Sequence, residues 1–311
     1  MFKRFTTRQL LITLGVLIGL YLISLMFGGR SERTFRQTIA ALDSAKVTQI
    51  LITPGGGQEL VTLTKNGSQW QVKLPNDRFA PTADGMVERA LGQINFLEAK
   101  QLVSRNEDQW SEYKVDTAGT RIQVMQGTEK ALDLILGRFE YRTTGMTYTR
   151  LSGEDETYMV NGFLETSFNK KTDDWRDKTI VKGSSNEWSA LTFTYPADTS
   201  YQILKGLDNN WILPDSTVLN TSEVNTYLGT LSSLNGTEFV DTTPSVSTPS
   251  FQLAIQSSSA GLIEIKAFAD AEHGFLISSS LNPQAYFSGE AGGLTEKVFV
   301  GIAKFLQPAD G

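Results

Sequence analysis

Two stretches of this sequence repeat one pattern and decide its fold. Residues 86–103 read MVERALGQINFLEAKQLV, and residues 223–240 read EVNTYLGTLSSLNGTEFV. Apolar residues in both recur at i, i+3, i+4 and i+7, the period of a helix that packs one face on a sheet. The apolar positions correspond at a constant offset of 137, with Val87, Ala90, Leu91, Ile94 and Leu97 in the first stretch and Val224, Tyr227, Leu228, Leu231 and Leu234 in the second.

The residues around the two helices extend the repeat. A strand with Trp and Leu-Pro precedes each helix, QWQVKLP at 69–75 and NWILP at 210–214. In the sequence after each helix, apolar and polar residues alternate, as in 122–124 and 253–255. This alternation predicts strands with one buried face. A short helix closes each copy, around residues 162–169 and 295–306.

We therefore expect an α+β protein with two related domains that arose by internal duplication. Each domain is predicted to be an antiparallel sheet packed with an amphipathic helix. The predicted boundaries are residues 47–182 for the first domain and residues 183–308 for the second.

An uncharged apolar stretch, LLITLGVLIGLYLISLMFG, occupies residues 10–28. As an α-helix it spans roughly 28 Å, close to the hydrocarbon thickness of a bilayer. A cleaved signal peptide is the alternative, but its apolar core is usually about 7–15 residues long and ends at a small-x-small cleavage site. Here Met26-Phe27-Gly28-Gly29-Arg30 follows. We expect an uncleaved transmembrane helix over residues 10–28.

The short basic tail of residues 1–9 is expected to stay in the cytoplasm. Basic residues also follow the helix, so the charge count alone does not orient it. Residues 29–46 are predicted to be a connector or stalk, and both domains are then extracytoplasmic at a bacterial inner membrane. Phe35, Ile39 and Leu42 have helical spacing, so the connector either extends the helix or packs on the first domain.

Gly15 and Gly19 form a GxxxG pair inside the apolar stretch. Glycines four residues apart lie on one helix face and let a second helix approach backbone to backbone. The pair therefore predicts helix packing in the membrane. The alternative is a helix that only tethers, because glycine is common in membrane helices.

The composition excludes several kinds of site. Without cysteine, the chain forms no disulfide, zinc–thiolate site or cysteine nucleophile. A single histidine removes every two-histidine metal motif, and the net charge of −6 argues against a nucleic-acid partner. Residues 184–311 hold 4 basic and 13 acidic side chains. This acidic second domain either attracts a basic partner or presents a solvated surface.

No motif predicts catalysis. His273 lies in Asp-Ala-Glu-His-Gly at a predicted turn, and residues 154–156 are predicted to form a hairpin tip. Residues 167–170 match S-x-x-K, but the S-x-N and K-T-G partners of that serine–lysine motif are not in place. We expect a protein that is not an enzyme, with no catalytic or metal-binding residues and no cofactor.

The order of these features resembles a bacterial family of singly anchored extracytoplasmic proteins encoded beside ABC exporter components of the gliding-motility type. The residues that carry the resemblance are the anchor, Trp70, Leu74-Pro75, Ala83-Asp84, the helix with Val87, Leu91, Ile94 and Leu97, the tract Leu102-Val103, and Tyr148 with Tyr158. The resemblance implies an accessory subunit that works with a polytopic permease and its ATPase.

Two functions remain open. The first is this accessory subunit, a non-catalytic protein whose helix meets permease and lipid and whose duplicated domains bind a partner or cargo. The second is a free-standing, tethered envelope-binding protein for glycan or peptidoglycan. Trp110, Trp175 and Trp188 lie outside the repeated Trp pair and would supply its sugar-stacking surfaces.

Overall fold

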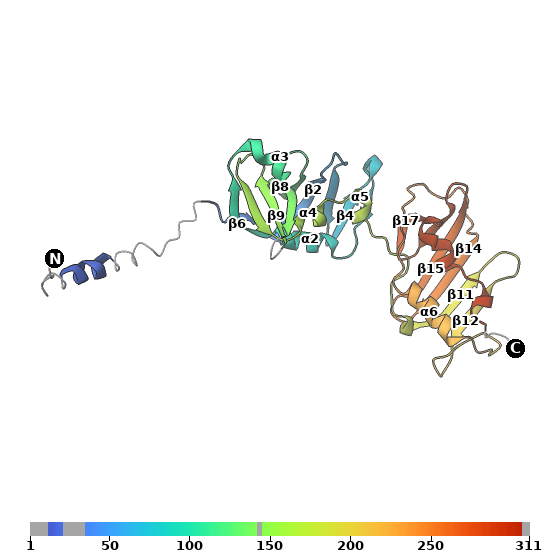
Figure 1. Cartoon of the computed structure of the whole chain (residues 1–311). Helices are drawn as coiled ribbons and strands as arrows, with labels where there is room; N and C mark the ends of the chain where they lie inside the picture. The colour runs from blue at the N-terminus through green and yellow to red at the C-terminus, as the bar shows by residue number, and fades with distance from the viewer. Residues whose placement is uncertain (1–11, 21–34, 142–144, 307–311) are drawn as a thin grey trace.

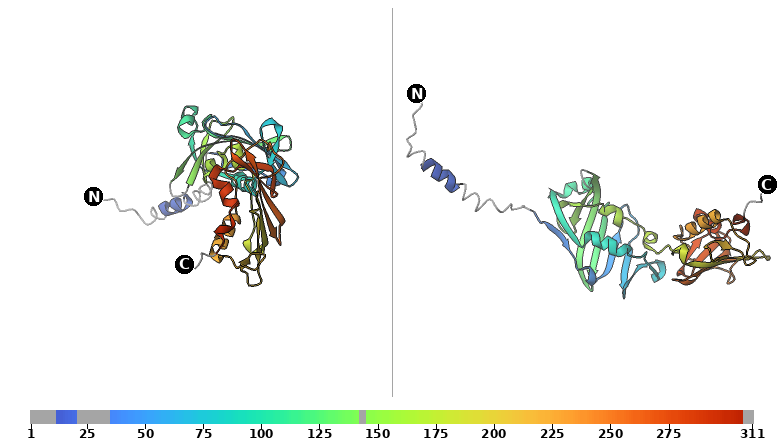
Figure 2. Two further views of the ribbon diagram at one scale, coloured as in Figure 1. Left: turned by 90° about the vertical axis from the view of Figure 1, so that its right-hand side faces the viewer. Right: turned by 90° about the horizontal axis from the view of Figure 1, so that it is seen from below.

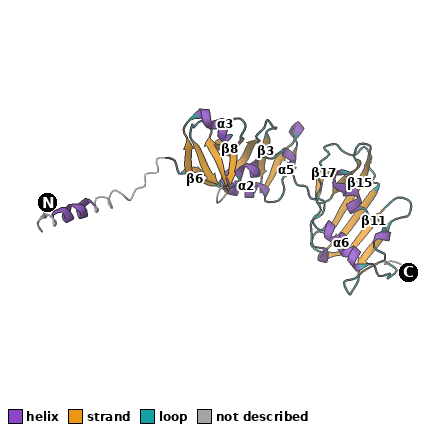
Figure 3. Cartoon of the chain, in the orientation of Figure 1, coloured by secondary structure: helices purple, strands orange, loops and turns teal. Residues whose placement is uncertain are grey.

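The computed structural model describes residues 12–20, 35–141 and 145–306. It contains two bodies, each built on one antiparallel sheet (Figure 1). Strands dominate both bodies and the helices are short (Figure 3). The predicted α+β class with antiparallel sheets is confirmed.

The predicted membrane segment is described only in part. Residues 12–20 are helical, whereas residues 10, 11 and 21–28 lie outside the described residues. Among the helices that the structure describes, none combines the length and the apolar character needed to cross a membrane.

The first body holds a ten-stranded sheet in the order β1-β6-β10-β9-β8-β7-β2-β3-β4-β5. Its strands are β1 (Thr38–Ala41), β2 (Val47–Thr53), β3 (Val61–Asn66), β4 (Gln69–Lys73), β5 (Phe79–Pro81), β6 (Phe96–Ser104), β7 (Thr120–Gln126), β8 (Glu129–Tyr141), β9 (Gly145–Leu151) and β10 (Thr157–Asn161). Its helices are α2 (Met86–Ile94), α3 (Trp110–Tyr113), α4 (Leu164–Phe168) and α5 (Thr172–Trp175).

The second body holds a seven-stranded sheet in the order β13-β12-β11-β14-β15-β16-β17. Its strands are β11 (Trp188–Thr194), β12 (Tyr201–Lys205), β13 (Trp211–Ile212), β14 (Phe251–Ser257), β15 (Gly261–Asp270), β16 (Gly274–Ser279) and β17 (Asn282–Ser288). Its helices are α6 (Thr221–Leu231) and α7 (Leu294–Val298). Figure 2 shows both bodies from two further directions.

The two sheets share one strand order. The run β10-β9-β8-β7-β2-β3-β4 of the first sheet corresponds to β17-β16-β15-β14-β11-β12-β13 of the second. In each body one longer helix follows the strand that carries the buried Trp, Trp70 in β4 and Trp211 in β13. The short helices α4 and α7 each follow the last hairpin. This shared order supports the predicted duplication.

The predicted apolar faces of the two longer helices are their buried faces. The buried residues are Val87, Ala90, Leu91 and Ile94 in α2, and Val224, Tyr227, Leu228 and Leu231 in α6. Each face belongs to the hydrophobic core of its own body. The 3.6-residue period therefore identified both helices and the side on which each sheet lies.

The connector differs from one of its two predicted forms. Residues 38–41 are not an extension of the helix but form β1, which pairs antiparallel with β6. Ile39 and Ala40 are buried, and Phe35 and Leu42 pack against the same core. The helical spacing was misleading because an edge strand with both of its central residues buried loses the simple alternation of a half-exposed strand. The other form, packing on the first domain, is the observed one, so the first body begins before residue 47.

Candidate functional site at the domain junction

The two glycines predicted to pack in the membrane lie in the helical residues 12–20. A Cβ atom added at Gly15 or Gly19 would meet no atom of the described residues within 4 Å. The described residues therefore leave both glycines without a neighbour, and the packing of this face against another helix stays a prediction.

The polar motifs lie where the sequence placed them. His273 occupies the turn between β15 and β16, and its Nδ1 lies 3.0 Å from Asp270 Oδ1. The hydrogen bond with Asp270 raises the pKa of His273. Residues 154–156 form the tip between β9 and β10, where Glu154 pairs with Arg36 at 2.6 Å. Among the described residues, no group of three or more His, Cys, Asp or Glu side chains is arranged to hold a metal ion.

The three Trp residues proposed for sugar stacking do not form an open surface. Trp175 and Trp188 are fully buried in the two cores. Trp110 is partly exposed, but the Arg150 guanidinium lies 3.7 Å from its ring centre. These contacts leave Trp175 and Trp188 no face for a ligand and cover one face of Trp110.

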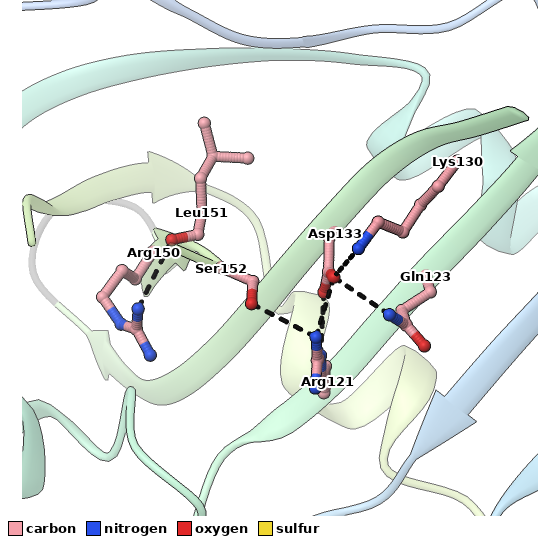
Figure 4. Close-up of polar contacts among 7 residues, drawn as sticks. All are labelled: Arg121, Gln123, Lys130, Asp133, Arg150, Leu151 and Ser152. Atoms are coloured by element: carbon pink, nitrogen blue, oxygen red, sulfur yellow. Dashed lines mark hydrogen bonds and ion pairs between the residues drawn. The ribbon is translucent and has the colours of Figure 1, made fainter. Parts of the chain in front are cut away.

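A charged cluster on β7 and β8 is a cross-link within the first sheet (Figure 4). Asp133 accepts hydrogen bonds from Arg121 at 2.8 Å, Lys130 at 2.7 Å and Gln123 at 2.9 Å. Burial alone would raise the pKa of Asp133, but these donors outweigh it and hold the pKa well below its usual value. Arg121 also donates to Ser152 Oγ at 3.2 Å. The donors that bind the Asp133 carboxylate thus all come from the same sheet, and the cluster is structural.

The junction between the bodies is held by a buried arginine. Arg176 follows α5, and its side chain is 3% exposed. It donates to Asp173 of the first body at 3.0 Å, and its two terminal nitrogens donate to Asp241 of the second body at 3.2 and 3.0 Å. Its guanidinium also lies 3.6 Å from the ring centre of Phe239. This forked pairing and ring stacking fix orientation in a way that a flexible lysine does not.

The backbone after Arg176 is bonded to both bodies. The Asp177 amide donates to Pro81 O at the end of β5, at 2.9 Å. The Ile180 amide donates to Leu234 O in the second body, also at 2.9 Å. Asn282 Nδ2 donates back to Asp177 O at 2.7 Å. A linker bonded on both sides in this way is a fixed connection rather than a free hinge.

A cleft of about 490 Å³ opens between the bodies beside this linker. Its acidic lining residues are Asp84 and Glu88 from the first body and Asp177 from the linker. Lys182 also lines it and pairs with Asp84 at 2.7 Å, with both side chains exposed. Three carboxylates and one ammonium suit a basic or hydrogen-bond-donating segment better than an anion.

Sequence reasoning missed Arg176 and its partners. Asp241 directly follows the second repeated stretch, and Arg176 stands near the predicted boundary at residue 182, but 65 residues separate the pair. The one available signal was an acidic run, Asp173-Asp174, that ends in Trp175 and Arg176 beside that boundary.

A family model described as a domain of unknown function (DUF4340) matches residues 70–250. The match starts at the buried Trp of β4, crosses the junction and ends just before β14, and it spans more than half of the chain. The chain therefore belongs to the DUF4340 family. Comparison with curated proteins gives no match, and comparison with solved structures gives none either.

Proposed function

We propose that this member of the DUF4340 family is a non-catalytic accessory subunit of an ABC-type transport complex of the gliding-motility-like kind. Residues 10–28 anchor it in the bacterial inner membrane as a single transmembrane helix, with residues 1–9 in the cytoplasm. Its partners are a polytopic permease, the ATPase of that complex and the surrounding lipid. The two bodies lie outside the cytoplasm and bind a partner or cargo.

One observation carries this proposal, the buried Arg176 that fixes two bodies of the same strand order. A subunit that only tethers a binding domain needs no defined angle between its parts. A subunit that holds a binding surface over a permease does, because the surface must stay at a constant height and orientation. The forked Arg176–Asp241 pair supplies that constraint.

Internal duplication gives the proposed extracytoplasmic part of the chain two similar modules, the first and the second body. The shared order of seven strands and the equivalent burial of Trp70 and Trp211 support a common origin. Duplication provides two related surfaces, one on each body, and this is the simplest way for one chain to contact two positions of a larger complex.

The acidic charge of the second body and of the junction cleft favours a basic partner. Residues 184–311 carry 9 more acidic than basic side chains, and the junction cleft adds Asp84, Glu88 and Asp177. We infer that a basic surface of a partner docks against the second body and the junction cleft, because complementary charge speeds and orients association.

The competing function is a free-standing, tethered glycan-binding protein. The burial of Trp175 and Trp188 removes the aromatic faces that would have favoured it. We retain it as an outcome of the test.

Extraction of the tagged full-length chain in a mild detergent, followed by identification of co-purifying proteins, tests the proposal. We expect an ABC-type ATPase and a polytopic permease in stoichiometric amounts. Recovery of the chain without either protein contradicts the proposal, and recovery with envelope glycan supports the competing function.

A matched pair of variants then asks whether the helix docks. Replacing Gly15 and Gly19 with Ile fills the small-residue face with branched side chains and is expected to abolish co-purification at unchanged membrane abundance. Replacing Thr13 and Leu17 with Ile alters the opposite side of the helix and is the control. Unchanged co-purification of the Gly15→Ile/Gly19→Ile variant means that the extracytoplasmic bodies carry the association.

A further inference from the structure

The exposed aromatic side chains gather in the first body. Among the described residues of the two bodies, the exposed aromatic residues are Phe79, Phe96, Phe139, Tyr141 and Phe163. All of them belong to the first body. The described residues of the second body leave no Phe, Tyr or Trp side chain exposed. Such an uneven distribution indicates that something covers part of the first body.

Four of these rings lie at one end of the ten-stranded sheet. The antiparallel pairing of β8 with β9, of β9 with β10 and of β10 with β6 places the end of β8 beside the end of β10 and the start of β6. Tyr141 is the last residue of β8, Phe139 precedes it by two residues, and Phe96 is the first residue of β6. Phe163 follows β10. We call these four residues the aromatic rim.

Three of the four rings form one continuous patch. The ring centres of Phe139 and Phe163 lie 5.6 Å apart. A Cβ atom added at Gly145 would overlap the Phe163 ring, so Phe163 lies directly on the cross-strand partner of Tyr141. Phe96 adds a ring that is 62% exposed at the same end of the sheet. The rim is therefore a set of rings held by paired strand ends.

The carboxylates beside the rim in the sequence are engaged by other side chains. Glu140 precedes Tyr141, but alternation along β8 directs it to the opposite face, where it accepts from the Tyr148 hydroxyl. Glu98 of β6 pairs with Lys100 at 2.9 Å. The rim thus presents rings and one phenol hydroxyl, a combination that suits a boundary between an apolar medium and water.

The rim lies close to the point at which the chain enters the first body. The ring centres of Phe35 and Tyr158 lie 6.4 Å apart, and Tyr158 is three residues, or roughly 10 Å, from the end of β10. Seven residue steps separate Phe35 from Gly28, where the proposed membrane helix ends, and even fully extended they reach at most about 25 Å. The aromatic rim is therefore within reach of the surface of a bilayer that holds this helix.

We propose that the aromatic rim rests in the interfacial layer of the lipid bilayer, a proposal that depends on the proposed membrane anchor of residues 10–28. Aromatic rings favour this layer, where the body of the ring is in an apolar medium and its polar groups reach water. The second body is joined farther from the anchor and has no exposed ring among its described residues, as expected if the covering surface lies near the anchor. The anchor and the rim then hold the first body at two points and fix its orientation against the membrane.

Fluorescence of the full-length chain in phosphatidylcholine vesicles tests the proposal. Because the natural sequence contains no cysteine, Tyr141→Cys carries a single nitrobenzoxadiazole label. We expect its emission to shift to the blue and to be quenched by lipids that carry a nitroxide near the headgroup. Thr128→Cys is the matched control, since Thr128 lies in the exposed turn at the opposite end of β8 and its label is expected to emit as in water. Equal shifts and equal quenching of the two labels overturn the proposal.

A label on the anchor separates failure of this inference from failure of the proposed function. Leu17→Cys lies in the proposed membrane helix, and lipids with a nitroxide deep in the acyl chain are expected to quench its label. Quenching at Leu17 without quenching at Tyr141 overturns the inference and leaves the anchor in place. Absence of quenching at both positions contradicts the anchor and the inference together.

Removal of the rings provides the second arm of the test. Phe163→Cys places the label on the same rim, and it replaces Tyr141→Cys if a thermal melt shows that the latter fails to fold. In this background, joint replacement of Phe96, Phe139 and Tyr141 with Ser is expected to abolish most of the quenching. Phe79→Ser is the control, since Phe79 is exposed on the far edge strand β5 and is expected to leave the quenching unchanged. Shielding of the Phe163 label only after addition of the permease would assign the rim to a protein contact and overturn the proposal.

Discussion

The two bodies share an order of strands but differ in the segment that follows the longer helix. In the first body, β6 pairs with β1 on one side and with β10 on the other. In the second body, the equivalent residues after α6 form no strand but two isolated bridges, Thr179↔Asn235 and Phe239↔Phe287. Phe239 and Asp241 from that segment instead receive Arg176. The segment after the longer helix therefore completes the sheet in the first body, whereas in the second body it forms the contact with the first body.

The ends of the two modules also differ. Asn220 caps the start of α6, because its side chain accepts from the Ser222 and Glu223 amides, whereas Gly85 precedes α2 and supplies no side-chain cap. The second body further ties its final segment down with tyrosines, since Tyr195 and Tyr201 both donate to Val300 O. Burial raises the pKa of both phenols, so they remain neutral donors. The second module is thus closed by polar contacts that the first does not use.

The equivalent Trp residues test whether the two modules really correspond. Trp70→Ala and Trp211→Ala each remove a buried ring, and we expect each to cost its own body about 3–5 kcal/mol. Hydrogen exchange of core amides, measured for each sheet, reports the two bodies separately. If Trp211→Ala loosened the first sheet as much as the second, the bodies would not be separate modules.

Removal of the junction arginine tests the position at which the modules differ. Arg176→Ala is expected to cost about 2 kcal/mol, less than a fully buried pair, because Asp241 and Asp173 are partly exposed and regain water. Urea unfolding of the full chain measures this loss. Lys182→Ala breaks an exposed junction pair and serves as the control, with an expected change below about 1 kcal/mol. Equal effects of the two variants would remove the special role of Arg176.

The helix caps provide a smaller test. Asn220→Ala removes the side-chain acceptor at the start of α6 and is expected to cost about 1 kcal/mol. Asp84→Ala, which precedes α2 without capping it, is expected to cost less. Thermal melts compare the two variants, and a larger loss from Asp84→Ala would contradict this assignment.

The smallest expected effects concern pH, and they differ in sign between the bodies. In the first body the lowered pKa of Asp133 adds stability above its ordinary value of 3.8, and that stability is lost as the pH falls below it. In the second body the raised pKa of His273 adds stability below its ordinary value of 6.5, and that stability is lost as the pH rises through the raised value. Melting curves across pH of Asp133→Asn and His273→Gln should each lose one of these dependences. A variant that melts in parallel with the wild type at every pH excludes its residue as the source.

Local patterns predicted the parts of the fold that depend on local contacts. The 3.6-residue period of Val87 to Ile94 and of Val224 to Leu231 identified both helices and their buried faces. Alternation predicted strands such as β7, where Ile122 and Val124 are buried and Arg121 is exposed. The repeat made each assignment firmer, because both copies had to satisfy it.

The remaining features depend on contacts between distant residues. β1 was ambiguous because Ile39 and Ala40 are adjacent and both buried, which breaks the two-residue period. The Arg176–Asp241 pair joins residues that no local period relates. The proposed function depends on this pair.

The distance between the two bodies is the most direct test of a fixed junction. Because the chain has no cysteine, Thr128→Cys and Ala260→Cys place one spin label at each of two equivalent exposed turns, between β7 and β8 and between β14 and β15. Pulsed electron paramagnetic resonance then gives the distribution of distances between the labels. A fixed junction predicts a single narrow distribution that becomes broad in the Arg176→Ala variant. A broad distribution in the otherwise unaltered chain, or one that Arg176→Ala leaves unchanged, would contradict it.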